Sequence, residues 1–553
     1  MPAQEPARGS APAPGSAPPR GGLLRTLAGS CPTAAGESIL ALAAPLGLRI
    51  PSSCGGAGSC HECIVEIVSG ADALSPPAPE EGFLRPPHRL ACQARVIDAE
   101  ARIEVRPLLR RPQILTESEP VPGPVAPAVT VEQGTVRLDG APLGPAGGAV
   151  LGLALDLGTT TIVLELVDLQ AGRVLARSAF VNPQSFGGSD VMHRISYETT
   201  EHPGELRRVL MALLNDEIDR LPAAGQDIYE VAAVGNPTMR DLFFGIDVRP
   251  LGQRPFQSRT EQALRRGEAL TTAIARQARE FGLHIQPRGR VWGGPLVGSH
   301  LGADIAAGLL VSGLAEAEGH RMLIDIGTNT EIIAGNRDRL VGASCPAGPA
   351  FEGAGLGCGM PGVEGAIERL AIADGRPRYR TIGGGEPEGV CGSGLIDLVA
   401  ELLRHGVIDP LGRFRDGGKA FTICSDPPLQ ITRQDLSDLA QAKAANYAGQ
   451  QILMKGLGVR PAALERIDLA GGFAHYIDPA NAMAIGLIPE VPLERVHKLG
   501  NAALAGARHL LLNSPARARL DRLVRRVEHI ELEQDPEFFR IFTAGCQFRP
   551  QPA

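Results

Sequence analysis

Residues 153–164 read LALDLGTTTIVL, and residues 322–333 read MLIDIGTNTEII. Each stretch consists of an apolar run, an Asp, a Gly-Thr turn and a second apolar run, a pattern that predicts a β-hairpin. The turn offers backbone N–H groups and hydroxyls to a phosphate. The Asp before it can hold Mg²⁺ through water or orient an attacking water. Because the pattern occurs twice, it predicts two related lobes that face one nucleotide site.

A third stretch, residues 467–473 (IDLAGGF), predicts a strand that runs into a Gly-Gly turn. Glycines at such a turn let the backbone approach a flat ligand closely. Two phosphate turns followed by a Gly-Gly turn resemble the actin/Hsp70/sugar-kinase superfamily, over about residues 150–553. In that superfamily the last turn contacts adenosine. The resemblance implies ATP with Mg²⁺, with Asp156 and Asp325 as catalytic residues.

The expected nucleotide-binding residues lie in the three turns and in one loop at a strand end. They are Gly158, Thr159, Thr160, Gly235, Asn236, Gly327, Thr328, Asn329, Gly471 and Gly472.

The loops at residues 234–239 and 391–397 each lead into a predicted helix. A helix N-terminus can face an anion, but it can equally be an ordinary helix start with a polar cap. The sequence leaves both interpretations open. Cys345 and Cys358 lie in a Gly-rich stretch without a close cysteine pair, so we expect small buried side chains rather than a second metal site.

Four cysteines near the N-terminus, Cys54, Cys60, Cys63 and Cys92, predict an iron–sulfur site. Plant-type [2Fe–2S] proteins use three close cysteines and a distant fourth, although the first gap here is one residue longer. The glycines between Cys54 and Cys60 allow unusual backbone angles and bring amide N–H groups near the cluster. A zinc site is the alternative, but zinc ligands usually come in two close pairs. Flanking segments predict a short helix at 38–42 and strands at 64–68 and 102–105.

The composition restricts the class of protein. The chain has 553 residues, a net charge of -7 and 4% aromatic residues, which disfavours a nucleic-acid-binding protein. We expect no membrane span, because no run of about 18 apolar residues occurs. The first residues are rich in Ala, Pro and Gly without an apolar signal region, which predicts a disordered tail. Ten cysteines in so long a chain favour a reducing, cytoplasmic location over a disulfide scaffold.

A proline-rich stretch follows the cysteine region and includes two strand-like segments, at 128–131 and 135–138. Proline at this density gives a semi-rigid spacer, which suits a carrier domain that swings between donor and acceptor. An ordinary connector between domains is an equal alternative.

Taken together, the chain resembles the reductive activators of corrinoid proteins, the RACo family. The matching strings include the cysteine motif, RLACQ at 89–93, NPQ at 182–184, GNPTM at 235–239, GPAFEG at 348–353 and CGSG at 391–394. The resemblance implies a multidomain fold of α+β and α/β parts: a β-grasp ferredoxin domain, a linker, and duplicated RNase H-like lobes of the actin/Hsp70 type. The expected parts are a disordered tail at 1–21, a [2Fe–2S] domain at 22–106, a linker domain at 107–148, a middle domain with the first lobe at 149–310, and a C-terminal ATPase domain at 311–553.

The resemblance also implies a function. Such activators use ATP to drive an electron from the [2Fe–2S] cluster to Co(II) of a corrinoid methyl-carrier protein, which regenerates Co(I). The implied partners are that carrier protein and an electron donor that the sequence does not identify. Members of the superfamily often pair through the C-terminal lobe, so we expect a homodimer. Two alternatives remain open: a ferredoxin-type electron carrier on a non-catalytic ATPase scaffold, and a small-molecule kinase of the same superfamily.

Overall fold

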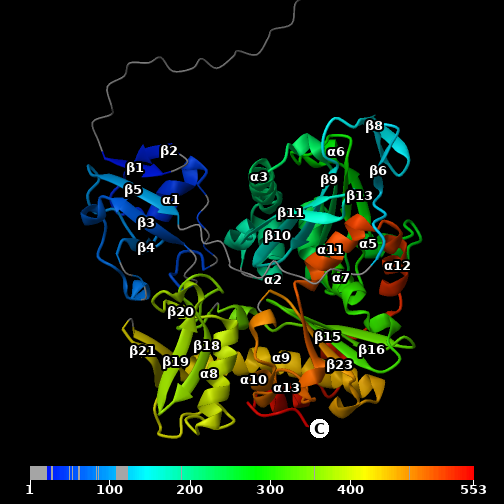
Figure 1. Ribbon diagram of the computed structural model, residues 1–553. Helices are drawn as coiled ribbons and strands as arrows, with labels where there is room; N and C mark the ends of the chain where they lie inside the picture. The colour runs from blue at the N-terminus through cyan, green and yellow to red at the C-terminus, as the bar shows by residue number, and fades with distance from the viewer. Residues whose placement is uncertain are drawn as a thin grey trace, which may run out of the picture. The chain divides into compact units, whose positions relative to one another are not determined.

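The fold was examined in a computed structural model (Figure 1). The described residues are 22–26, 29–48, 50, 52, 54–59, 63–82, 84, 86–107, 123–188, 190–353, 355–426, 428–472 and 474–552. The chain forms two compact units: residues 1–50 with 56–108, and residues 51–55 with 109–553. The expected tail at 1–21 and the proline-rich residues 108–122 lie outside the described part.

The first unit is a small sheet with one short helix. Its elements are β1 (Leu23–Thr26), β2 (Gly29–Pro32), α1 (Ile39–Ala43), β3 (Ile64–Ser69), β4 (His88–Leu90) and β5 (Arg102–Pro107). The strand order is β2-β1-β5-β3-β4, with β1 and β5 parallel and the other pairs antiparallel. This is the β-grasp arrangement expected for the ferredoxin domain.

Sequence patterns explain the elements of this unit. The Ser38 side chain accepts a hydrogen bond from the Ala41 N–H and so caps the start of α1. Apolar side chains alternate along β3 and β5, and Val65, Ile103 and Val105 are fully or almost fully buried in the core beneath α1. The predicted helix and both predicted strands are therefore confirmed.

The second half of the expected linker forms a three-stranded meander. Its strands are β6 (Val129–Glu132), β7 (Thr135–Leu138) and β8 (Ala141–Pro145). Val129 and Val136 are buried in the same core as residues of the adjacent lobe. These strands are packed structure, so a spacer role could belong only to the part of the segment before them.

The first lobe is built around a six-stranded sheet. Its elements are β9 (Leu151–Leu157), β10 (Thr161–Asp168), β11 (Arg173–Val181), α2 (Val191–Ser196), α3 (Glu205–Asp219), β12 (Ile228–Gly235), α4 (Pro237–Phe244), α5 (Arg259–Arg265), β13 (Ile274–Gln277), α6 (Ala278–Phe281), β14 (Arg290–Gly293) and α7 (Ala303–Ser312). The strand order is β11-β10-β9-β12-β14-β13. β9, β10 and β11 are antiparallel, whereas β12 is parallel to both β9 and β14.

The second lobe repeats this plan. Its elements are β15 (Arg321–Ile326), β16 (Thr330–Gly335), β17 (Leu340–Cys345), β18 (Ala366–Ala373), β19 (Arg376–Thr381), β20 (Gly389–Val390), α8 (Gly392–Arg404), β21 (Ala420–Ser425), β22 (Pro428–Thr432), α9 (Arg433–Leu457), β23 (Arg466–Ala470), α10 (Pro479–Ala484), β24 (Val496–Gly500), α11 (Ala502–Leu512), α12 (Pro515–Val524), β25 (Val527–His529) and α13 (Phe538–Gly545).

The two main sheets share one topology. In the second sheet β15, β16 and β17 are antiparallel, and β23 is parallel to both β15 and β24. Its order, β24-β23-β15-β16-β17-β25, therefore matches the first sheet strand for strand over β9, β10, β11, β12 and β14. The duplicated lobes predicted from the two Asp-Gly-Thr stretches are confirmed. Between β17 and β23 the chain adds the sheet β19-β18-β20 and the hairpin β21–β22.

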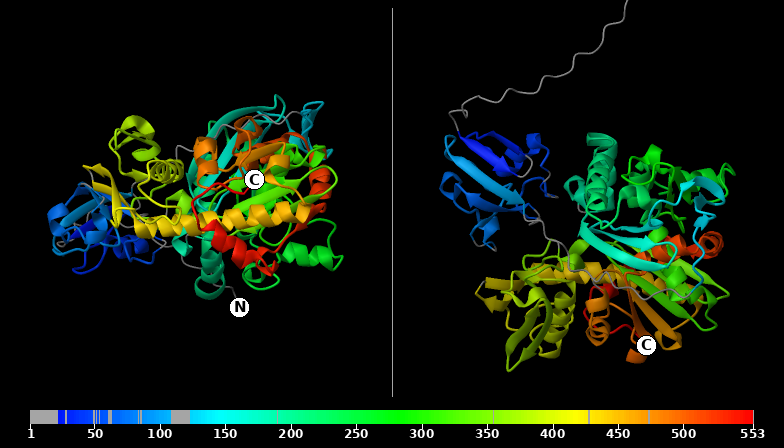
Figure 2. Two further views of the ribbon diagram at one scale, coloured as in Figure 1. Left: turned by 90° about the horizontal axis from the view of Figure 1, so that it is seen from below. Right: turned by 45° about the horizontal axis from the view of Figure 1, so that its top comes forward.

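Helices cover both faces of each main sheet. The amphipathic helix α3 packs Leu206, Leu210 and Leu214 against the first sheet, as its apolar periodicity predicts. The long helix α9 runs across the second sheet against β16 and β17 (Figure 2). Among the described residues, no helix is long and apolar enough to cross a membrane.

The C-terminal helices α11 and α12 return to the first lobe. α7 and α11 pack against each other between the two sheets (Figure 1), and α11 also contacts β9 and β12. Arg508 on α11 binds the buried carboxylate of Glu165 on β10 at 2.7 Å, and Arg517 on α12 binds buried Glu230 on β12 at 2.9 Å. Through these ion pairs, α11 and α12 connect the C-terminal part of the chain to the first lobe.

Candidate nucleotide site and cluster loop

The two phosphate turns meet each other. Thr160 lies in the turn between β9 and β10, and Thr328 lies in the turn between β15 and β16. Their hydroxyl oxygens are 3.0 Å apart although they are 168 positions apart in the chain. The structure thus brings the two predicted turns, one from each lobe, into a single site.

A carboxylate joins these hydroxyls. Oε2 of Glu352, at the end of the 3₁₀ turn η9 (Pro349–Glu352), accepts hydrogen bonds from Thr160 at 2.9 Å and from Thr328 at 2.5 Å. Burial raises the pKa of Glu352, while the two hydroxyl bonds and the charge of Arg194 oppose the rise. Glu352 lies in one of the family-matching strings but was not predicted as a site residue.

Amide side chains hold the first turn. Asn501, the N-cap of α11, donates to Asp156 Oδ2 at 2.8 Å, and its own oxygen accepts from the Leu504 N–H. Asn236, the N-cap of α4, donates to the Thr159 hydroxyl at 2.9 Å. The Asn236 loop is thus a helix start with a polar cap, which is one of the two interpretations that the sequence leaves open, and its amide also contacts the first turn.

The second Asp lies against the Gly-Gly turn. A Cβ atom on Gly471, whose φ is +106°, would lie 3.0 Å from Asp325 Oδ1 and 2.3 Å from the Ile326 carbonyl oxygen. Glycine is therefore required here by both backbone angle and space. Gly472 follows in the same turn and is half-buried.

The site brings together several buried carboxyl groups whose ionisation is disfavoured. Burial raises the pKa of Asp325 to about 8, and the charges of Asp304 and Asp156 add to the rise. The pKa of Asp156 rises to about 7 and that of Asp304 to about 6, in both cases chiefly through burial. Glu331, which faces Asp325 across the β15–β16 pair, also has a raised pKa for the same reason. A cation that enters this site would relieve the repulsion between these carboxylates.

The carboxylates are not arranged to hold a metal ion directly. Within the described part of the chain, no group of three or more His, Cys, Asp or Glu side chains has that geometry. Mg²⁺ commonly keeps several waters and binds proteins through one or two carboxylates and substrate phosphates. The donor set therefore fits a hydrated Mg²⁺ that arrives with a nucleotide.

In the first unit, the residues around Cys63 and Cys92 have features that suit an iron–sulfur cluster. The pKa of the Cys92 thiol falls to about 6, mainly because of its hydrogen bond with the Cys63 thiol, and the Gly58 N–H adds to the effect. Gln93 Nε2 donates to the Gly56 carbonyl at 2.8 Å. These thiols and amides suit sulfur ligation, because N–H groups directed at cysteine sulfur stabilise thiolates.

The other two predicted ligands are Cys54 and Cys60. Cys54 lies half-buried in a turn whose glycines Gly55 and Gly56 have φ values of +62° and +93°. Cys60 and the neighbouring His61 lie outside the described residues. The pair Cys63 and Cys92 is therefore the part of the ligand set whose proximity the structure gives.

Comparison with known proteins assigns the family. A model of the RACo middle region matches residues 151–317, one of the C-terminal ASKHA domain of RACo matches residues 320–552, and one of the 2Fe-2S iron-sulfur cluster binding domain matches residues 27–96. The corrinoid activation enzyme RamQ of Eubacterium limosum is 34% identical over 72% of this chain and 70% of its own length.

This chain belongs to the RACo family. A Methanosarcina barkeri reductase of a Co(II) methylated amine-specific corrinoid protein is 25% identical over 68% of this chain and 71% of its own. The solved structure of a reductive activator for corrinoid, iron-sulfur protein superposes with a TM-score of 0.67 at 28% identity. That match covers 96% of this chain and 99% of the other, so the whole RACo architecture is present.

The cysteines outside the predicted ligand set of this RACo protein differ in burial. Cys345, Cys358 and Cys391 are buried, and burial raises the pKa of Cys358 to about 12. Cys391 is the N-cap residue of α8, and its thiol donates to the Ile367 carbonyl. Cys424 and Cys546 are only half-buried.

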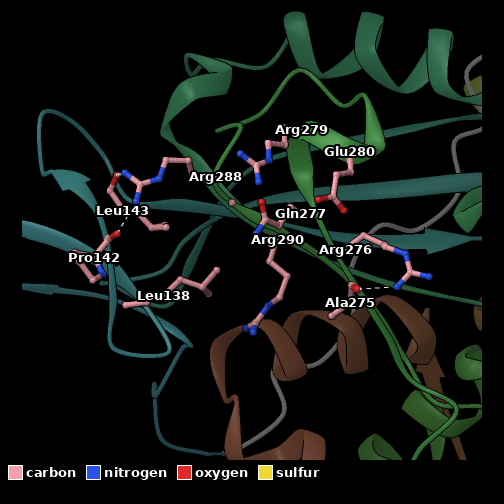
Figure 3. A pocket seen from close by; sticks show the side chains of 12 residues that line it. Leu138, Pro142, Leu143, Ala275, Arg276, Gln277, Arg279, Glu280, Arg288 and Arg290 are labelled. Carbon is pink, nitrogen blue, oxygen red and sulfur yellow. Dashed lines mark hydrogen bonds between the residues drawn. The ribbon is translucent and has the colours of Figure 1, made fainter. Parts of the chain in front are cut away.

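A separate pocket of this RACo protein lies away from the phosphate turns. It has a volume of 610 Å³ and is lined by residues of β7, β8, β13, α6 and β14, including Arg276, Arg279, Arg288 and Arg290 (Figure 3). Arg288 spans to the carbonyls of Pro142 and Leu143 on β8, and Arg290 bonds to buried Glu230. None of the predicted site residues lines this pocket.

Four residues of the site were not predicted from the sequence: Asp304, Glu331, Glu352 and Asn501. One signal was available for Asn501, because it follows a strand that ends in Gly, as Asn236 does. Asp304 stands in the first turn of the apolar helix α7, where an acidic residue is ordinary. Its proximity to Asp156 and Asp325 arises only when both lobes fold around α7.

Proposed function

We propose that this protein reactivates a corrinoid methyl-carrier protein, using ATP to drive an electron to Co(II) and regenerate Co(I). One observation supports this most directly: a ferredoxin-type domain and a paired phosphate site, with the Thr160 and Thr328 hydroxyls 3.0 Å apart, occur on one chain. The names of two relatives, a corrinoid activation enzyme and a reductase of a Co(II) corrinoid protein, support the same reaction.

Nucleotide binding is assigned to the turns of both lobes. Thr159 and Thr160 of the first turn and Thr328 and Asn329 of the second supply hydroxyl, amide and backbone donors to the phosphates. Gly471 and Gly472 are assigned to adenosine contact; a Cβ on Gly471 would collide with the Ile326 carbonyl, so this turn packs closely against the strand that carries Asp325. Asp156 and Asp325 would hold a hydrated Mg²⁺ that arrives with the nucleotide and would orient the water that attacks the terminal phosphate.

Cys54, Cys60, Cys63 and Cys92 are assigned as ligands of the [2Fe–2S] cluster. When bound, the cluster supplies one-electron chemistry at a potential that lies near about -400 mV in plant-type proteins. Gly58 and Gln93 orient the ligand loop, through the N–H bond to Cys92 and the bond to the Gly56 carbonyl. Reduction of Co(II) to Co(I) is difficult at such a potential, which gives ATP a role.

ATP can assist only through different affinities in two states of the protein. A ligand shifts an equilibrium by its differential affinity for the two conformations and by nothing else. The nucleotide contacts both lobes in this proposal, so binding and hydrolysis can alter how the lobes engage the corrinoid partner. We also propose a cytoplasmic location, a homodimer and a separate electron donor that the sequence does not identify, as expected above.

Replacement of Asp325 tests the assignment of two separable sites. Asp325→Ala should reduce ATP hydrolysis by at least about 100-fold, because it removes the carboxylate that orients water at the second turn. The visible absorption of the reconstituted cluster should remain unchanged. Measured ATPase activity close to that of the unmodified protein, or loss of the cluster spectrum together with the ATPase, would contradict the proposal.

A further inference from the structure

Glu352 occupies the position where a bound phosphate would be expected to find its donors. Its Oε2 accepts the hydroxyl protons of both Thr160, at 2.9 Å, and Thr328, at 2.5 Å. A threonine hydroxyl has one proton to donate. Both turn hydroxyls lie within hydrogen-bond distance of Glu352 as well as 3.0 Å from each other, so Glu352 can take the proton that either hydroxyl has to donate.

Burial raises the pKa of Glu352, whereas its two hydroxyl donors and the charge of Arg194 favour its ionised form. Arg194, on α2 of the first lobe, is 1% exposed and its charge opposes the rise in the pKa of Glu352. Its Nε donates to the Gly188 carbonyl at 2.9 Å and its Nη1 lies 3.1 Å from Met239 Sδ. A charged carboxylate with two hydroxyl donors forms hydrogen bonds that are stronger than neutral ones.

A bound phosphate and the Glu352 carboxylate would compete for the two threonine hydroxyls and would also repel each other. A terminal phosphate that binds both turns needs the same hydroxyl protons, and its oxygens carry charge of the same sign as the carboxylate. Both cannot occupy the hydroxyls at once. One of them must give way when a nucleotide binds.

We propose that Glu352 is a strap that holds the two phosphate turns together without nucleotide, and that the terminal phosphates of ATP displace it. This inference rests on the proposed nucleotide site and adds how its occupancy is sensed. Because Glu352 competes with phosphate, it weakens nucleotide binding. Its displacement by the nucleotide also moves the loop that carries Glu352.

The segment after Glu352 is built to pass the displacement on. Gly353 has φ of +82°, and a Cβ there would lie 2.2 Å from the Met360 carbonyl oxygen, so the two backbones are in close contact. The Met360 N–H donates to the Val390 carbonyl, next to the start of α8. Motion of Glu352 therefore acts on the loop that leads to the β19-β18-β20 sheet and α8.

The test compares nucleotide affinity in Glu352→Gln and Glu352→Asp. Gln keeps the size of the side chain but is a weaker, uncharged acceptor, whereas Asp keeps the charge and is too short to reach both hydroxyls. Calorimetric titration of the full-length protein with Mg²⁺ and a non-hydrolysable ATP analogue should show about tenfold tighter binding for both variants. Thermal unfolding of each variant checks that it is folded.

Each outcome decides the proposal. Unchanged or weaker binding by both variants overturns the strap, and tighter binding by Gln alone overturns it in favour of simple charge repulsion. Absence of binding by the unmodified protein contradicts the nucleotide site itself, and with it the proposed function. As a second readout, the analogue should raise amide hydrogen exchange in residues 349–360 of the unmodified protein, and Glu352→Gln should show the raised exchange without it.

Discussion

Gly471 is required both by its backbone angle and by its contact with the strand that carries Asp325. It has φ of +106°, and a Cβ there would lie 2.3 Å from the Ile326 carbonyl oxygen. Its place after β23 brings the turn against Asp325. Only glycine satisfies both the backbone angle and the packing. The Gly-Gly turn could therefore be predicted from sequence as a site of close approach.

Gly471→Ala should weaken nucleotide binding and lower the free energy of unfolding by about 2 kcal/mol, because the added methyl group forces the turn away from Asp325. Chemical denaturation and nucleotide titration measure the two effects. Gly375→Ala is the matched control, since it also has positive φ but nothing within 4 Å of the new atom. Equal effects at both positions would mean that backbone strain alone, and not the contact, matters.

Lys443 is a second residue with a measurable consequence. It is fully buried on α9, and its Nζ donates to the Gln547 carbonyl at 2.6 Å. Burial lowers its pKa from 10.5 to about 7. Between these pH values the unfolded chain binds a proton that the folded protein does not, so this group makes stability rise with pH from about 7 to 10.

Lys443→Met should therefore stabilise the protein at pH 6.5, by at most about 5 kcal/mol before the lost hydrogen bond is counted. The difference in melting temperature from the unmodified protein should shrink as pH rises to 9.5. Lys455→Met, at an exposed position of the same helix, should show no such narrowing. A stability difference independent of pH would refute the shifted titration of Lys443.

At the scale of elements, the packing of α11 against the first lobe contributes to the free energy of unfolding through a buried ion pair. Arg508 on α11 places its guanidinium on Glu165, which is 0% exposed and also receives Arg177 from β11. Removal of one partner from a buried ion pair leaves an incompletely compensated charge. The pair therefore holds the lobes together only while both partners remain.

Arg508→Met should lower the free energy of unfolding by about 3 kcal/mol in urea denaturation. Arg173→Met breaks the exposed pair with Asp168, 3.9 Å apart on the same sheet, and should cost less than about 1 kcal/mol. If both substitutions lower the free energy of unfolding equally, the buried pair does not stabilise the packing of α11 more than an exposed pair would.

Elements differ in how far sequence could predict them. The strands around Asp156 and Asp325 were predictable, because apolar runs flank a turn and the pattern recurs. The start of α4 at Asn236 was predictable from its cap, and so was the helix at 39–43. The contact of Asn501 with Asp156 was not, because 345 positions separate them and only the folded sheets bring β24 beside β23. Glu352 was hidden in a Gly-rich loop for the same reason.

At the scale of the whole molecule, the chain combines two units with different chemistry. The ferredoxin-type unit carries Cys63 and Cys92, and the larger unit carries the duplicated lobes with Thr160 and Thr328 in contact. The proposed reaction needs both, because the cysteines provide the electron site and the lobes provide the nucleotide site. Their cooperation is the central claim.

Anaerobic spectroscopy tests that claim most directly. The purified protein with reconstituted cluster is mixed with a Co(II) corrinoid protein and reductant, with and without Mg-ATP. The account predicts that the Co(I) absorption band forms with Mg-ATP and fails to form without it, or when Asp325→Ala replaces the unmodified protein. A Co(I) band that forms equally well without ATP would contradict the claim and leave the protein as a simple electron carrier.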